Sequence, residues 1–243
     1  VAVAFGSYPS NFKALMKKIN HLPNKDFEST RMLLWKAYEY GSRMHRGQKR
    51  SSGEPFFNHC VEVATILAKW KMDSTTIMAG LLHDTVEDTS VSLEDIELEF
   101  GEDLANLVDG LTKLSGIQFS TRKDKQAGNF MKMFISVAKD LRVIIVKFAD
   151  RLHNMSTIKY LSKIKQRRIA IETRDVYAPL AHRLGMSSVK SELDDLVFMT
   201  LDPVNYNHVK TKLKSSNRKI NKTISSYLDI VKVEMSKYKM NQI

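Results

Sequence analysis

This chain of 243 residues has little cysteine and no long apolar run, the features that mark disulfide-rich and membrane proteins. It contains one cysteine, Cys60, so no disulfide can form within it, which is typical of proteins from a reducing compartment. No apolar run approaches the roughly 20 residues that a membrane-spanning helix needs. The opening residues, 1–5, are too short for a signal-peptide core and have no basic residue ahead of it. We therefore expect a cytoplasmic protein that does not enter a membrane.

Proline and glycine, the residues that interrupt helices, number only five and ten. Strand-like alternation is scarce, and apolar residues recur at the three- and four-residue spacing of helices almost throughout the chain. The sequence therefore predicts an all-α fold. We expect an N-terminal helical lead over 1–27, a main domain over 28–203 and a basic helical extension over 204–243.

Acidic residues are outnumbered, with 27 Asp and Glu against 38 Lys and Arg and a formal net charge of +11. Such an excess attracts polyanions, which include nucleotides, nucleic acid and acidic protein surfaces. Part of the excess lies in 209–243, where a charged helix face is most often just solvated. The same segment carries an apolar stripe that either docks on the core or awaits another partner: Ile220, Ile224, Tyr227, Leu228, Val231, Met235 and Tyr238.

Several helix ends can be placed from local signals. Residues 11–45 read as two helices broken near Pro23. Asp73 can cap the helix that leads into the His83-Asp84 pair. Ser92-x-x-Asp95 resembles a capping box for a segment that stops at Gly101. A long polar connection over 116–128 follows the helix after that, and we hypothesise that it gates the functional site.

The stretch 80–88, Gly-Leu-Leu-His-Asp-Thr-Val-Glu-Asp, is the most informative one. If it is one helix, the potential metal ligands His83 and Asp84 share faces with the carboxylates Glu87 and Asp88 one turn later. Apolar residues upstream would bury the end of this helix, where ionisable groups need a compensating partner. A divalent cation is such a partner, although an adjacent His-Asp pair is also common as a surface or capping feature.

Two further residues raise the case for a metal. His59 lies on the apolar face of its segment, and Asp150 lies on an otherwise aliphatic helix face. Taken singly, His59 would be a core histidine and Asp150 the partner of Lys147 or Arg151. Together with the His-Asp pair they supply two imidazoles and two carboxylates. That set suits manganese, iron or zinc better than calcium or a thiolate-bound zinc.

A polar loop over 45–55 combines glycines, hydroxyls and the basic residues Lys49 and Arg50. Arginine forks match phosphate oxygens, and small residues let backbone N–H groups approach an anion. The loop can therefore wrap a phosphate, although a plain exposed loop is the default interpretation.

Four strings of residues carry a resemblance to a known family. They are Arg50-x-Ser52-Gly53-Glu54-Pro55 with His59, then 82–89 (LHDTVEDT), 148–155 (FADRLHNM) and 177–185 (YAPLAHRLG). The set resembles the HD-superfamily metal-dependent phosphohydrolases, and the fuller strings resemble the N-terminal hydrolase domain of the Rel/SpoT family of (p)ppGpp synthetases and hydrolases. The resemblance covers roughly residues 28–203.

The resemblance implies an HD-domain helical bundle that removes the 3′-pyrophosphate of guanosine tetra- or pentaphosphate, giving GDP or GTP. It implies one manganese ion per chain, held by His59, His83, Asp84 and Asp150. It places Glu87 and Asp88 on the acidic pair that hydrolysis needs. It also implies a nucleotide site lined by Arg50, Ser52, Asn154 and Thr157, with Lys49 as a further basic contact.

The chain departs from the family pattern at three positions. Ser51 and Ser156 stand where basic residues are common, which would weaken phosphate contacts. Cys60 follows His59 in place of a proline, which at a helix start mainly presets geometry. Because no ligand and neither acidic residue is lost, we expect an active hydrolase.

Three other interpretations fit parts of the sequence. The chain could be an HD phosphohydrolase acting on another nucleotide, a metal-free basic module, or a domain that senses the nucleotide without cleaving it. The basic module predicts nucleic-acid binding with a steep salt dependence, but no zinc-finger, helix-turn-helix or stacking-aromatic pattern stands out, so we expect no specific nucleic-acid partner. The C-terminal helix resembles the connector that leads into a synthetase domain, so the chain fits a fragment or a small hydrolase of unspecified oligomeric state.

Overall fold

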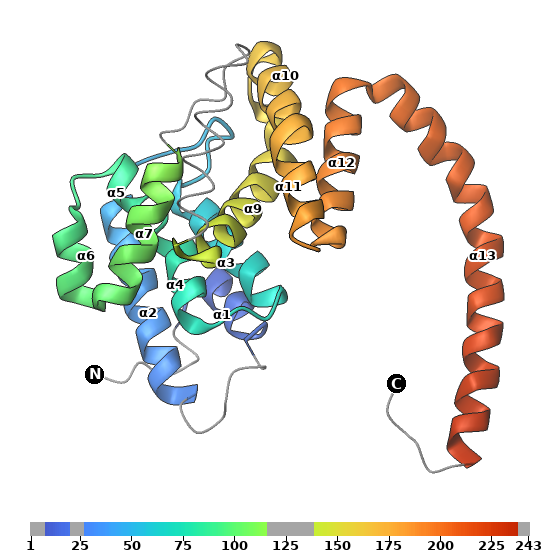
Figure 1. Ribbon diagram of the computed structural model, residues 1–243, viewed down its shortest axis with the longest axis horizontal. Helices are drawn as coiled ribbons and strands as arrows, with labels where there is room; N and C mark the ends of the chain where they lie inside the picture. The colour runs from blue at the N-terminus through green and yellow to red at the C-terminus, as the bar shows by residue number, and fades with distance from the viewer. Residues whose placement is uncertain (1–7, 20–26, 116–138, 238–243) are drawn as a thin grey trace.

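Helices form most of the residues that this computed structural model describes, which are 8–19, 27–115 and 139–237 (Figure 1). The predicted all-α fold is confirmed, because these residues contain no β-strand beyond an isolated bridge between Lys49 and Pro55. The elements in chain order are α1 (Ser10–Met16), α2 (Phe27–Met44), α3 (Phe57–Lys69), α4 (Ser74–Leu82), α5 (Thr85–Asp88), α6 (Leu93–Phe100), α7 (Glu102–Ser115), α9 (Leu141–Ser156), η3 (Ile158–Tyr160), α10 (Lys163–Glu172), η4 (Thr173–Tyr177), α11 (Ala178–Arg183), α12 (Ser187–Leu201) and α13 (Pro203–Lys237).

The centre of the bundle is the pair α3 and α4, which pack closely against each other and against α9. Their backbones approach at Gly80, where an added Cβ would lie 2.7 Å from Leu67 Cδ1 and 3.1 Å from Ala64 Cα. The two helices run in opposite directions, so the start of α3 lies beside the end of α4. His59 and His83, which are 24 positions apart, therefore come from neighbouring helix ends.

The local signals for helix ends are confirmed. The Asp73 carboxylate accepts a hydrogen bond from the Thr76 N–H at 3.0 Å, which caps α4. Ser92 and Asp95 form the capping box of α6, and that helix stops at Gly101, whose φ is +91°. α1 and α2 are separate helices as expected, while Pro23 lies outside the described residues.

The two ends of the described chain differ in how they pack. α1 buries Phe12 and Leu15 fully and joins the same hydrophobic core as α3. α13 instead extends away from the bundle (Figure 1), starting at the cap that Asp202 provides for the Asn205 N–H. As far as residue 237, its apolar stripe does not dock on the core, since Ile224 is 50% and Tyr227 67% exposed, while Tyr238 lies outside the described residues. Over the described ranges, no helix combines the length and the apolarity that crossing a bilayer requires.

Replacing Gly80 by valine should destabilise the protein, because the new side chain would push α4 off α3. Overpacking of this kind typically costs about 1–3 kcal/mol. The free energy of unfolding from urea titration measures the loss. Ser188→Val, which introduces the same side chain at an exposed position of α12, is the control and should change it little. Equal stability of the two variants would contradict the close approach.

Candidate metal centre and adjoining cavity

The His83-Asp84 pair lies at a break between two helices. α4 ends at Leu82 and α5 begins at Thr85, so the uninterrupted helix expected over 80–88 is wrong. Asp84 has φ −96° and ψ −1°, in the bridge region where many active-site residues lie. This conformation places its Oδ2 3.0 Å from His83 Nε2. One helical turn still spans the break, because Asp88 N donates to Asp84 O at 2.9 Å.

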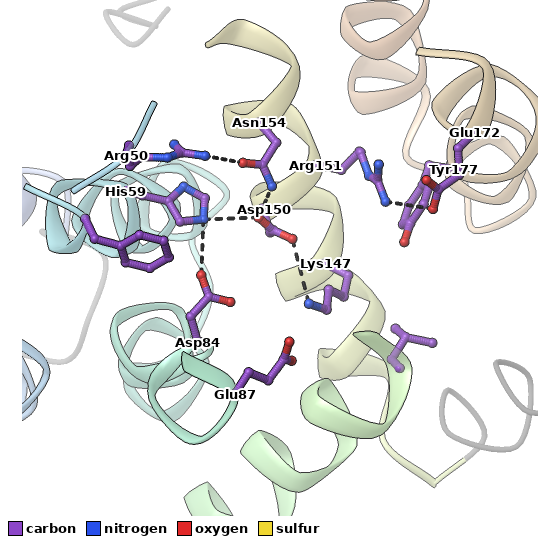
Figure 2. A pocket seen from close by; sticks show the side chains of 12 residues that line it. Arg50, His59, Asp84, Glu87, Lys147, Asp150, Arg151, Asn154, Glu172 and Tyr177 are labelled. Atoms are coloured by element: carbon purple, nitrogen blue, oxygen red, sulfur yellow. Dashed lines mark hydrogen bonds and ion pairs between the residues drawn. The ribbon is translucent and has the colours of Figure 1, made fainter. Parts of the chain in front are cut away.

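The structure brings the four predicted metal ligands together, and Figure 2 shows three of them, His59, Asp84 and Asp150. His59 Nε2 lies 3.2 Å from Asp150 Oδ1 and 3.6 Å from Asp84 Oδ2. His83 Nε2 lies 3.9 Å from Asp150 Oδ1. Two ligands that bind one ion at about 2.1 Å lie about 3.0–3.5 Å apart. The donor atoms of His59, His83 and Asp150 all lie within 4.8 Å of one another, and Asp84 Oδ2 lies within 3.6 Å of both histidines, so the four residues can converge on a single divalent ion.

The protonation of His83 supports this fit. Its Nδ1 lies 2.9 Å from the carbonyl oxygen of Gly80, which can only accept, so Nδ1 carries the proton. Its Nε2 is buried and faces the Asp84 and Asp150 carboxylates at 3.0 and 3.9 Å. Lone pairs that converge in a buried site need a proton or a cation between them. A metal with imidazole and carboxylate ligands meets that need.

Electrostatics show how the site is balanced without a metal. Burial disfavours the charged form of His83, but the nearby Asp84 and Asp150 carboxylates outweigh it and raise the pKa of His83 to about 9. Burial likewise opposes ionisation of Asp150, yet the charges of Lys147 and of the protonated His83 hold the pKa of Asp150 well below its usual range. A proton on His83 thus occupies the role that a cation would take.

Cys60 belongs to an alternative set of possible ligands, with His83 and Asp84. Its side chain is fully buried, and burial together with the Asp84 charge raises the pKa of the Cys60 thiol well above its usual range. The thiolate is the metal-binding form. The Cys60 thiol is therefore a poor ligand, whereas His83 and Asp84 of the same set stay available beside His59 and Asp150.

A cavity of about 340 Å³ opens onto three of the proposed ligands, His59, Asp84 and Asp150, while His83 lies buried behind them. Among the residues expected to act in catalysis or substrate binding, Glu87, Arg50 and Asn154 line it. The Glu87 carboxylate points into the space between Asp84 and Lys147 (Figure 2). The full lining is Arg50, Phe56, His59, Asp84, Glu87, Leu114, Lys147, Asp150, Arg151, Asn154, Glu172 and Tyr177.

Four other expected site residues do not line the cavity. Lys49 is exposed in the isolated bridge, and Ser52 Oγ lies 3.5 Å from a carboxylate oxygen of Glu54. Thr157 donates its hydroxyl to the backbone of its own helix at 2.9 Å. Asp88 is exposed as a residue, but the partial burial of its carboxylate and the charge of Asp84 raise its pKa. The predicted gating connection, 116–128, lies outside the described residues.

The far wall of the cavity was not anticipated as part of the site. Arg151 lies 4.0 Å above the Tyr177 ring and pairs with Glu172 at 3.0 Å. Tyr177 ends the π-helical turn η4, a form often found at functional sites. Lys147 is buried, with its Nζ 3.7 Å from Asp150 Oδ2. The spacing from Asp150 pointed to Lys147 and Arg151 as neighbours, but no pattern links them to Glu172.

Comparison with known proteins gives consistent matches. The model of a family described as HD domain matches residues 37–187. A GTP pyrophosphokinase from Myxococcus xanthus is 46% identical over 207 residues, which are 84% of this chain and 27% of that protein. The bifunctional (p)ppGpp synthase/hydrolase SpoT from Escherichia coli (strain K12) is 45% identical over 211 residues, 86% of this chain and 30% of that protein. The chain thus spans less than a third of the length of these relatives.

A solved structure also matches, described with the words "A metazoan ortholog of SpoT hydrolyzes ppGpp and plays a role in starvation responses". It is 28% identical, has a TM-score of 0.50 and covers 70% of this chain and 96% of that one. Sequence relatives and structural neighbour together confirm the resemblance to the Rel/SpoT family.

The raised pKa of His83 predicts a pH-dependent stability in chelator. The folded pKa of about 9 lies above the unfolded value of about 6.5. The stabilisation is therefore complete below the unfolded pKa and is lost as pH rises through the folded one, by about 3 kcal/mol. Urea titrations between pH 6 and 10 measure it. His182→Asn, at an exposed histidine, should keep the slope and His83→Asn should lose it; a flat wild-type profile would count against the assignment.

Proposed function

The chain belongs to the HD-domain family, and on that basis we propose that it is a metal-dependent hydrolase that removes the 3′-pyrophosphate of ppGpp or pppGpp to give GDP or GTP. The observation that carries the proposal is the gathering of four donor atoms, from His59, His83, Asp84 and Asp150, at the edge of a cavity. The names of the relatives and of the structural neighbour point to the substrate.

We propose His59, His83, Asp84 and Asp150 as the ligands of one ion, with manganese as its identity. When bound, such an ion would polarise a phosphate oxygen and lower the pKa of a water molecule. The nitrogen and oxygen donors suit manganese, and the buried Cys60 thiol stays outside the set.

The cations around the cavity suit a substrate with many negative charges. Arg50, Lys147 and Arg151 line it, and the charge of Lys147 is stabilised by Asp150 although burial opposes it, so its pKa is raised. An ammonium and two guanidinium groups can hold the oxygens of a pyrophosphate and compensate the charge that develops on the leaving group. The guanine nucleotide is accordingly the proposed partner of this site.

We assign the acid–base role to Glu87. Its carboxylate points into the cavity beside Asp84, from where it can orient a water molecule and take its proton. Asp88 lies one residue further along α5 and does not line the cavity. Its carboxylate interacts electrostatically with Asp84, His83 and His59, so it adds negative charge beside the site.

The purified chain should release GDP and pyrophosphate from ppGpp in the presence of Mn²⁺ and none in chelator. The double variant His83→Ala, Asp84→Ala should be inactive, because it lacks half of the proposed ligands. Chromatography of the nucleotides follows the reaction, with dGTP and GTP as competing substrates. Turnover in chelator, or faster cleavage of another nucleotide, would refute the assignment.

Glu87→Gln should lower kcat by about 10²–10⁴-fold, the usual contribution of a general acid or base, and leave Mn²⁺ affinity unchanged. Asp88→Asn is the matched control and should lose much less activity, since its carboxylate lies outside the cavity. Initial rates at saturating ppGpp make the comparison. An equal or larger loss in Asp88→Asn would reverse the assignment of roles.

A further inference from the structure

We propose that Arg50 is the common anchor of two hydrogen-bond chains that orient His59 and Asp150 for metal binding. This inference rests on the proposed metal site and assigns Arg50 a positioning role beyond contact with substrate. One chain passes through His153 and the other through Asn154. These two residues are neighbours on α9, one turn after Asp150.

The first chain fixes the protonation of His59. Arg50 Nη1 lies 3.1 Å from His153 Nδ1, which in turn lies 2.6 Å from His59 Nδ1. A guanidinium can only donate, so His153 Nδ1 must accept and carries no proton. The proton between the two rings therefore belongs to His59 Nδ1. His59 Nε2 is left with a lone pair, directed at Asp150 and Asp84.

The contact between His153 and His59 is of a kind that metal sites use. In metal sites, groups that hold the far nitrogen of a ligating histidine set its tautomer and its orientation. His153 stands in that position toward His59.

The second chain fixes Asp150 (Figure 2). Arg50 Nη2 donates to Asn154 Oδ1 at 2.5 Å, and Asn154 Nδ2 donates to Asp150 Oδ1 at 2.5 Å. Because the guanidinium can only donate, it determines which end of the amide faces it. The NH₂ group must then point to Asp150. The same oxygen of Asp150 lies 3.2 Å from His59 Nε2, so the two chains meet at the proposed metal.

Arg50 is itself held in place by its loop. Its backbone N–H donates to Glu54 O at 3.0 Å, and its carbonyl accepts from Gly53 N at 2.8 Å. Gly53 has φ +87°, which only glycine adopts at little cost, so the turn is well defined. Loss of the guanidinium would leave His153 and Asn154 without the donor that orders both. A residue that only touched substrate would have no such effect in the absence of nucleotide.

The test is Mn²⁺ affinity of the nucleotide-free protein, measured by isothermal titration calorimetry. Arg50→Met keeps the length of the side chain and removes every donor, and should weaken binding about 10–100-fold. Arg46→Met, at an exposed arginine of the same loop, is the matched control and should bind as wild type. Circular dichroism establishes that both variants are folded.

A second pair of variants separates hydrogen bonding from packing at His153. His153→Leu should weaken Mn²⁺ binding, whereas His153→Asn should restore most of it, since its amide oxygen can replace Nδ1 as acceptor. ¹⁵N NMR of histidines in the metal-free protein gives an independent readout. It should find His59 protonated on Nδ1 in wild type and lose that preference in Arg50→Met.

The outcomes separate the two proposals. Wild-type affinity and an unchanged His59 tautomer in Arg50→Met would overturn the positioning role and leave the proposed hydrolase intact. A wild-type protein that binds no Mn²⁺ would overturn both. Weakened binding in Arg50→Met and His153→Leu, with Arg46→Met unaffected, would establish the two chains.

Discussion

Buried charge is the constraint on which the rest of this structure depends. Two carboxylates and two imidazoles meet at the ends of α3 and α4 and on α9, where water is largely excluded. Without a cation the balance rests on a proton at His83 and on the ammonium of Lys147. The close crossing of α3 and α4 at Gly80 sets the separation of the two histidines. The packing of the core therefore determines how the buried charges at the cavity are compensated.

The fold and the ligand set could be predicted from sequence because their signals are local or repeated. Helical periodicity, the Asp73 cap and the capping box at Ser92 each depend on residues within a few positions of one another. The break between His83 and Asp84 could not, since helical spacing continues through it. At the break the Asp84 carboxylate turns toward His59 on α3, a tertiary contact, and toward the neighbouring His83.

Away from the metal ligands, the spacing of residues in the sequence predicts which helix face a side chain lies on but not what that side chain contacts. The spacing of seven residues places Thr157 on the same helix face as Asp150. In the structure, however, the Thr157 hydroxyl donates to the backbone of its own helix. The loop composition marked Lys49 and Arg50 alike, yet only the side chain of Arg50 reaches α9. Glu172 and Tyr177 reach the cavity through a π-helical turn, whose extra residue per turn leaves no mark in the periodicity.

α13 has a mechanical consequence. It is a 35-residue helix, about 52 Å long at 1.5 Å per residue, and it starts at the Asp202 cap, where the Phe198 and Tyr206 rings meet edge to face at 5.6 Å. A tilt of about 10° at that joint would carry its far end through about 9 Å. α12, which leads into the joint, packs on the helix that carries Asp150. A movement at the far end of α13 would therefore act, through α12, on the helix that lines the cavity with Asp150.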